Sequence, residues 1–180
     1  MGTPVLIPRL RRMIESSSVD LFPDLPDSSR AWLYAAISPI AAQQQAMILY
    51  ALEPTISKWK SHGTIIPAHA IFLDEVTLLV AADFSGAEMS GCSIDRMIAS
   101  VREAGADVGV ELVDTPRGVH HWDTDGLRFS TREHFAELVR TRFVDGGTAV
   151  LDLTVITLGA VRSGRWKRGA NEGWHAKAFF

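Results

Sequence analysis

Short apolar runs divide the first two thirds of the chain into segments of two kinds. Four runs are rich in apolar residues, are bounded by polar or turn residues, and are typical of strands. Two longer segments repeat apolar side chains every three or four positions, the spacing that gives a helix one buried face. The predicted strands are residues 30–37, 64–73, 76–84 and 108–113, and the predicted helices are residues 39–60 and 94–105.

The order of these segments is strand, helix, strand, strand, helix, strand. This is the order of the ferredoxin-like split βαβ arrangement, in which two right-handed crossovers place both helices on one face of an antiparallel sheet. Only Asp74 and Glu75 separate the second and third predicted strands, which predicts a hairpin. The sequence therefore predicts an α+β fold with a ferredoxin-like core.

Polar residues, prolines and glycines mark the predicted ends of the helices. Ser38 and Pro39 suit the N-cap and the first position of the first helix, and Gly63 suits its C-terminal end. Pro54 lies inside this helix and is expected to kink it. Ser93 is the expected N-cap of the second helix.

The last third of the chain adds a helix, a strand and an irregular tail to the predicted core. Residues 114–126 have the composition of a loop, Ser130 begins a capping-box pattern that opens a helix, and residues 148–158 predict a strand. The tail holds Trp166 and Trp174. We expect it to pack over the domain, because disordered tails contain few aromatic residues.

The N-terminal stretch has the composition of a linker. Prolines, serines and aspartates interrupt it before Arg30, so we predict an extension or linker over residues 1–29 and a single α+β domain over residues 30–180. Its beginning has no long apolar core of the kind that a signal peptide requires. No run in the chain approaches the roughly 18 apolar residues needed to cross a bilayer, so no membrane association is expected.

Composition narrows the classes of function. Apolar residues make up 47% of the chain and charged residues 22%, as in an ordinary soluble domain. The formal net charge of −3 gives no basic surface, so nucleic-acid binding is not expected. The single cysteine excludes an internal disulfide and suits the cytoplasm. The chain has no glycine-rich phosphate loop, and we predict no cofactor.

The predicted topology gathers chemically active side chains at one end of the sheet. In a split βαβ fold, the turn before the second strand and the loop before the second helix lie at the same end. The residues expected to meet there are Arg30, Trp59, His62, Cys92, Ser93 and Asp95.

Helix geometry gives this end a preference for negative charge. The first backbone N–H groups of a helix have no intrahelical acceptor, and the helix dipole adds to their positive potential. They would stabilise a thiolate at Cys92 or bind a carboxylate or phosphate. Purely structural alternatives remain open: Cys92 as a small packing residue, Ser93 as a simple cap, His62 bonded to the last helical carbonyls, and Arg30 paired with a surface carboxylate.

Two functions follow from this end of the predicted sheet. The first is a binding or assembly module that holds a small anionic ligand or a protein partner. The second is a thiol-dependent enzyme, with Cys92 as nucleophile, His62 as base and Asp95 as a further candidate catalytic residue. The candidate ligand-binding residues are Arg30, Gly91, Ser93, Trp59 and Trp174. We favour binding, because the sequence gives no complete set of nucleophile, base and orienting group.

Adjacent histidines raise the question of a metal site. His120 and His121 precede Asp123 and Asp125. Neighbouring side chains rarely point the same way and no cysteine joins them, so we interpret this stretch as a polar surface loop and predict no metal site.

Four stretches resemble a group of small bacterial proteins from the Bacteroidetes and Chlorobi lineages. They are "LPDSSRAWLY" (25–34), "WKSHG" (59–63), "SGCSIDR" (90–96) and "WHAKAFF" (174–180), in the same order and spacing. Members often carry the label "ABC transporter ATPase", although this chain has no phosphate loop. The resemblance marks as family positions Arg30, Trp32, His62, Gly91, Cys92, Ser93, Asp95 and Trp174, and it implies no chemical role for any of them.

Overall fold

The computed structural model describes residues 21–115 and 117–180. Its helices and antiparallel strands confirm the α+β class. The elements are, in chain order, β1 (Arg30–Ala35), α2 (Ala42–Ser57), β2 (Lys60–Ser61), β3 (Thr64–Ile65), β4 (Ala68–Phe72), β5 (Thr77–Ala82), α3 (Gly91–Ala106), β6 (Val119–Asp123), β7 (Gly126–Ser130), α4 (Arg132–Arg140), β8 (Ala149–Leu151), α5 (Leu158–Arg162), β9 (Lys167–Gly169) and α6 (Gly173–Phe179).

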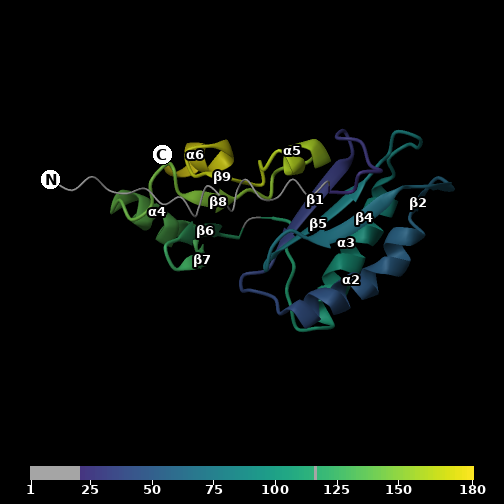
Figure 1. The fold of residues 1–180 in the computed structure, drawn as a ribbon, viewed down its shortest axis with the longest axis horizontal. Helices are drawn as coiled ribbons and strands as arrows, with labels where there is room; N and C mark the ends of the chain where they lie inside the picture. The colour runs from purple at the N-terminus through teal and green to yellow at the C-terminus, as the bar shows by residue number, and fades with distance from the viewer. Residues whose placement is uncertain (1–20, 116) are drawn as a thin grey trace.

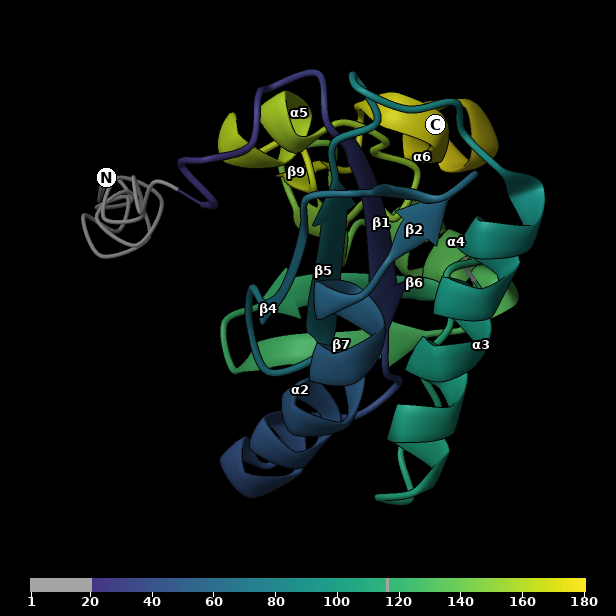
Figure 2. The same cartoon turned by 90° about the vertical axis from the view of Figure 1, so that its right-hand side faces the viewer.

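The two larger sheets lie at opposite ends of an elongated molecule (Figure 1), and β2 and β3 form a separate two-stranded sheet. The first sheet has the order β1-β5-β4, and the second has the order β7-β6-β8-β9, with every neighbouring pair antiparallel. Helices α2 and α3 lie side by side over one face of the first sheet (Figure 2). Helices α4 and α6 contact each other beside the second sheet, and α4 also contacts β7 (Figure 1).

The central strand of the first sheet is buried on both faces. Leu78 and Val80 point into the cluster beneath α2 and α3, which contains Ile48 and Met97. On the other face, Leu79 and Ala81 belong to a separate cluster. The other buried members of that second cluster are Leu25, Ala31, Leu33, Val155, Leu158 and Val161. A strand covered on both sides has a continuous run of apolar residues, which is why the sequence of residues 76–84 predicts a strand.

The strand predicted at residues 108–113 is reduced to one bridge. Val113 pairs with Ala35 on the free side of β1, through backbone hydrogen bonds of 2.8 and 3.0 Å. The residues before it close the helix instead, because the Val110 N–H donates to the carbonyl of Gly105. Gly105 permits this approach, since a Cβ there would lie 2.6 Å from the Val110 oxygen.

The first helix begins and ends at other residues than predicted. Helix α2 starts at Ala42, after an N-cap at Ala41 whose N–H donates to Gln44 Oε1, so Ser38 and Pro39 precede the helix. It continues through Pro54 and ends at Ser57. The predicted C-terminal glycine, Gly63, lies beyond it in the turn between β2 and β3.

The second sheet replaces a predicted loop. Residues 119–130, expected to be mostly loop, form the β6–β7 hairpin, whose turn is held by Asp123 Oδ1 accepting from the N–H groups of Asp125 and Gly126. His120 and His121 are buried in β6 and are not surface residues. The sequence showed no apolar signal for this strand, because two of its three buried residues are histidines.

Two further boundaries differ from the prediction. Thr131, not Ser130, caps α4, with its Oγ1 accepting from the His134 N–H. The strand predicted over 148–158 ends at Leu151, because Asp152 Oδ1 accepts from the N–H and hydroxyl of Thr154 and turns the chain toward α5.

The predicted N-terminal extension falls largely outside the described residues. Its last part, residues 21–29, lies against α5. Arg162 donates hydrogen bonds to the carbonyls of Leu21, Phe22 and Leu25, and Leu25 is buried. This contact completes the cover of the second face of the first sheet.

The C-terminal tail packs onto the fold, and β9 and α6 give it regular structure. Trp166 joins the cluster around Leu79, while Trp174 and Phe179 pack with Phe135. Phe180 is 56% exposed, so the expected burial does not extend to the last residue.

Candidate functional site

A short hairpin carries His62 at the end of the first sheet. Strands β2 and β3 are joined by His62 and Gly63, whose φ values of 48° and 86° are those of a tight hairpin turn. His62 is exposed at the tip. The Ser61 hydroxyl donates to the Glu88 carbonyl at 2.5 Å, which ties this hairpin to the loop that leads into α3. His62 is therefore carried on an element that contacts the segment before Cys92.

Helix α3 begins three residues earlier than the sequence pattern indicates. Ser90 is the N-cap, and its side chain makes no capping hydrogen bond. Gly91, Cys92 and Ser93 form the first turn, and the first two are exposed. The expectation that Ser93 caps the helix is wrong: it lies inside the helix and its hydroxyl donates to the Ser90 carbonyl. Cys92 thus sits on an uncapped, solvent-facing first turn.

Aromatic rings form a tight cluster at the same end of the sheet. Trp32 and Trp59 have ring centroids 5.7 Å apart, and each contacts Phe84, which precedes α3. The Arg30 guanidinium lies 5.7 Å from the centre of a Trp32 ring. Trp59 is 4% exposed, and its Nε1–H has no hydrogen-bond acceptor in the described part of the chain. This end therefore combines a cation with an unsatisfied N–H donor.

The predicted residues do not all come together. Asp95 is exposed on α3, and within residues 21–115 and 117–180 no hydrogen bond or ion pair joins it to Cys92 or His62. Trp174 belongs to the cluster of the second sheet, where the Arg132 guanidinium lies 5.0 Å from its ring centre. Trp174 therefore does not share the end of the first sheet with Cys92.

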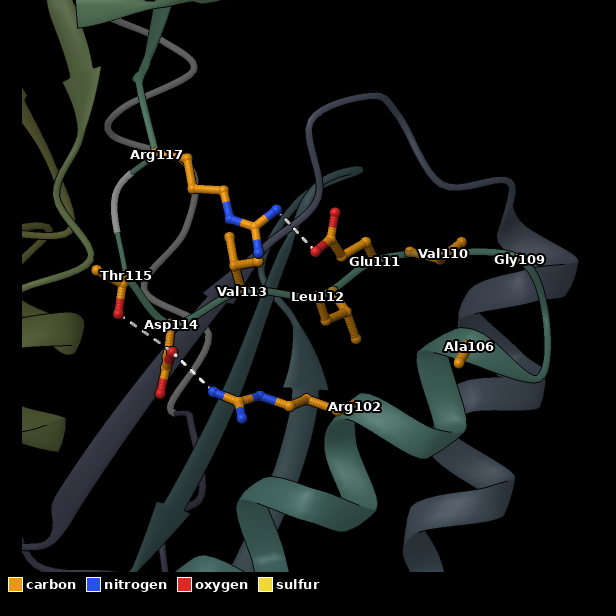
Figure 3. A pocket seen from close by; sticks show the side chains of 10 residues that line it. All are labelled: Arg102, Ala106, Gly109, Val110, Glu111, Leu112, Val113, Asp114, Thr115 and Arg117. Atoms are coloured by element: carbon orange, nitrogen blue, oxygen red, sulfur yellow. Dashed lines mark hydrogen bonds and ion pairs between the residues drawn. The ribbon is translucent and has the colours of Figure 1, made fainter.

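A pocket lies at the opposite end of α3 (Figure 3). Its volume is about 600 Å³, and it is lined by Arg102 and Ala106 of α3 together with residues 109–115 and 117. Two arginines lie on either side of this segment: Arg102 pairs with Asp114 at 3.5 Å, and Arg117 pairs with Glu111 at 2.8 Å. Sequence reasoning missed this pocket, because much of its wall is main chain of a segment expected to be an ordinary strand.

A third group of polar side chains is buried beneath α6. His175 is fully buried, and neither ring nitrogen has a hydrogen-bond partner among the described residues. Burial lowers the pKa of His175 to about 4, against the opposing attraction of Asp152. Asp152 is itself 1% exposed and pairs with Arg168 at 3.2 Å. The sequence offered no signal for this group, since Asp152, Arg168 and His175 come from different segments and form no motif.

The adjacent histidines have structural contacts. His120 Nε2 lies 2.8 Å from the Ala36 carbonyl oxygen, and His121 Nε2 lies 3.1 Å from the Ser130 hydroxyl. Burial lowers the pKa of both imidazoles. Across the described residues, no three His, Cys, Asp or Glu side chains are grouped so that they could bind a metal ion. His120 instead joins the second sheet to the segment after β1, and His121 joins β6 to the end of β7 within that sheet.

Comparisons with other proteins leave the site to be interpreted from its own geometry. Of the helices that the structure describes, none has both the length and the apolar character needed to cross a membrane. No family model matches this sequence, and neither the curated proteins nor the solved structures provide a significant match.

Proposed function

We propose that the protein is a binding or assembly module that holds a small anionic ligand, or an acidic segment of a protein partner, at the first turn of α3. The observation that carries this proposal is the uncapped helix start, where Gly91 and Cys92 are exposed. Their N–H groups are among the helix donors that lack an intrahelical acceptor, and the dipole of a 16-residue helix reinforces their potential. Such an end attracts a carboxylate or phosphate oxygen.

The surroundings of this turn supply further donors. Arg30 lies over Trp32 in the same aromatic cluster as Trp59 and Phe84, and Phe84 leads into the α3 loop. The hairpin tip adds His62, which is exposed and able to donate from its ring. We propose Arg30 as the residue that contributes a full positive charge to the bound anion, and Gly91 and Ser93 as the positions that shape the turn.

A thiol-dependent enzyme is the second candidate. Exposure of Cys92 in the first helical turn favours it, because a thiolate there would be stabilised by the same N–H groups. Enzymes usually enclose the reacting group in a pocket. The pocket at the other end of α3 is lined by residues other than Cys92 and His62, and we therefore favour binding over catalysis.

The test of binding is a titration of isotopically labelled protein, followed through its backbone amide signals. The probes are inorganic phosphate and a blocked hexaglutamate peptide. We expect the signals of Gly91, Cys92 and Ser93 to shift with either probe, and the variant Arg30→Gln to bind several-fold more weakly. Arg102→Gln removes one positive charge at the far end of α3 and is the matched control. Shifts spread evenly over the surface, or an equal effect of the two variants, would overturn the proposal.

The enzyme alternative has a separate measurement. The rate of Cys92 alkylation by iodoacetamide is measured against pH, with His62→Gln as the variant. Alkylation at a pH well below the range in which an ordinary cysteine thiol reacts would favour Cys92 as a nucleophile, provided that the reaction is slower in the variant. A thiol that reacts as an ordinary exposed cysteine leaves the binding module as the function.

We also propose that residues 30–113 are a ferredoxin-like split βαβ unit with a reduced fourth strand. Support comes from the order β1-β5-β4, from α2 and α3 on one face, and from the position of Val113 on the free side of β1. A cytoplasmic location and membership of the bacterial group that the four stretches resemble are part of the same proposal.

A further inference from the structure

Helix α6 is held on the second sheet by side-chain packing. The ring of Phe179 lies 4.9 Å from that of Phe135 on α4, measured between centroids, and Trp174 contacts Phe179. Within the part of the chain that the structure describes, no hydrogen bond or ion pair joins α6 to another helix or strand. Strand β9, which precedes α6, is by contrast paired with β8. Helix α6 can therefore leave the sheet while this strand pairing stays intact.

Three polar atoms of α6 are buried without a partner among the described residues. They are the Nε1 of Trp174 and both ring nitrogens of His175, whose side chain is fully buried. Each atom gives up water on docking and gains no hydrogen bond, which destabilises the docked helix. Release of α6 returns all three atoms to water. Docking is therefore a balance between apolar packing and polar groups that favour release.

The surroundings of His175 oppose a positive imidazole. Burial lowers the pKa of His175 to about 4, and two arginines act in the same direction against the attraction of Asp152. Arg168 of β9 already pairs with the Asp152 carboxylate, at 3.2 Å. Arg132 of α4 lies over Trp174, whose ring centroid is 4.0 Å from that of His175. The docked helix therefore holds a neutral imidazole, whereas the imidazole of a released helix is hydrated and takes up a proton more readily.

We propose that a proton releases α6: when the imidazole of His175 binds a proton from solvent, the helix leaves the second sheet while both larger sheets stay folded. The released form carries this proton in water, whereas the docked form would have to hold it in a buried site beside two guanidinium groups. Release exposes the ring of Phe135, which is fully buried under the docked helix. This release takes place at the second sheet and does not depend on the anion site proposed at the first turn of α3.

Amide hydrogen exchange of the full chain at pH 7 and pH 5 tests the release. With the intrinsic effect of pH on exchange removed, we expect protection of the Ala176 N–H, which donates to the Glu172 carbonyl, to fall about twentyfold. A pKa of about 4 for His175 in the docked helix and of 6.5 after release gives this factor. Exchange at Ala176 should also be faster than at Leu79 of β5 and insensitive to low urea, because local release exposes little surface.

Two variants connect the change in protection to His175. His175→Asn removes the titrating group and should abolish the twentyfold change, whereas His134→Gln, at an exposed histidine of α4, should keep it. Arg132→Gln leaves the imidazole in place and removes one of the two cations that face it. The fall in protection between pH 7 and pH 5 should then be smaller than in the natural protein. Arg140→Gln, at another exposed arginine of α4, is the matched control and should leave the fall unchanged.

Three results would overturn the inference. The first is an undiminished change in His175→Asn. The second is an equal fall in Arg132→Gln and Arg140→Gln, which holds its meaning even where His175→Asn does not fold. The third is exchange at Ala176 with the same rate and the same urea dependence as at Leu79, which would mean that α6 opens only when the whole protein unfolds.

Discussion

The two larger sheets of this protein bury different kinds of side chain. Beneath α2 and α3, the first sheet is packed with apolar residues such as Leu78 and Val80, which are fully buried. Around the second sheet, three buried histidines and Asp152 are mixed with a smaller apolar cluster. Among the described residues, all the buried histidines belong to β6 or α6. The comparison teaches that the first sheet depends on volume and packing, whereas the second also depends on the charge state of its imidazoles.

The largest expected effect is on the core of the first sheet. Leu78 on the central strand is fully buried between β5 and the two helices. We expect Leu78→Ala to lower the free energy of unfolding by about 2–5 kcal/mol, through lost burial and the cavity that remains. Chemical denaturation at pH 7 measures this loss. Met47→Ala, on the half-exposed face of α2, is the control and should change stability by less than about 0.5 kcal/mol.

A second measurement separates this apolar core from the second sheet. The loss from Leu78→Ala should be nearly the same at pH 7 and pH 5, because no titratable group is removed. A loss that depends strongly on pH would contradict the view that the first sheet is stabilised by packing alone.

The second prediction concerns pH and His175. The folded-state pKa is lowered to about 4 from 6.5, so between these values the unfolded chain binds a proton that the folded chain does not. Stability is therefore full above about pH 6.5 and falls as the pH falls toward 4. We expect the shifted pKa of His175 to lower the free energy of unfolding by about 2 kcal/mol between pH 7 and pH 5. Burial shifts the pKa of His120 and His121 in the same direction.

Denaturation curves at several pH values test this prediction. His175→Asn should reduce the loss of unfolding free energy between pH 7 and pH 5 by about 2 kcal/mol. This holds however much the substitution destabilises the protein at pH 7. His134→Gln removes an exposed histidine from α4 and should leave the decline unchanged. The prediction is wrong if both variants keep the full pH dependence of the natural protein.

The smallest expected effect concerns the cover over the second face of the first sheet. Arg162 is 22% exposed, and it bonds three carbonyls of residues 21–25 as well as the Asp27 carboxylate. An ammonium group cannot reproduce this fork, so we expect Arg162→Lys to cost about 1–2 kcal/mol in thermal or chemical unfolding. Arg140→Lys, at an exposed pair with Glu137, should cost less than about 0.5 kcal/mol. Equal effects would show that residues 21–29 contribute nothing to stability.

Sequence reasoning succeeded where one strong periodicity dominates. The strands at 30–37 and 76–84 are confirmed as the paired β1 and β5, because both are continuous apolar runs. The helix after Cys92 is confirmed, since Met97 and Val101 repeat at helix spacing and are buried. The hydrogen bond from Ser61 to the Glu88 carbonyl ties the His62 hairpin to the α3 loop, and the meeting of His62 with Cys92 itself stays a prediction.

Prediction failed where buried polar side chains or long-range contacts decide the structure. In β6, His120 and His121 are polar residues and interrupt any apolar pattern. Both are nevertheless buried, and each lies within hydrogen-bonding distance of an oxygen atom. At residues 108–113, strand propensity was overridden by the bond from Val110 to Gly105, which closes α3. The pocket at the sheet edge follows from that closure and has no pattern of its own.

Different segments of the chain cover the two faces of β5, and they are synthesised at different times. The helices over one face end at Ala106, but the residues over the other face include Leu158 and Val161. During synthesis, a nascent chain that has already paired β1 with β5 still exposes Leu33 and Leu79 on the uncovered side. That side stays open until residues 155–161 have left the ribosome, and chaperones bind exposed apolar surface of this kind, which also promotes aggregation. The second face of the native sheet is therefore covered well after its strands are synthesised, by residues 155–161.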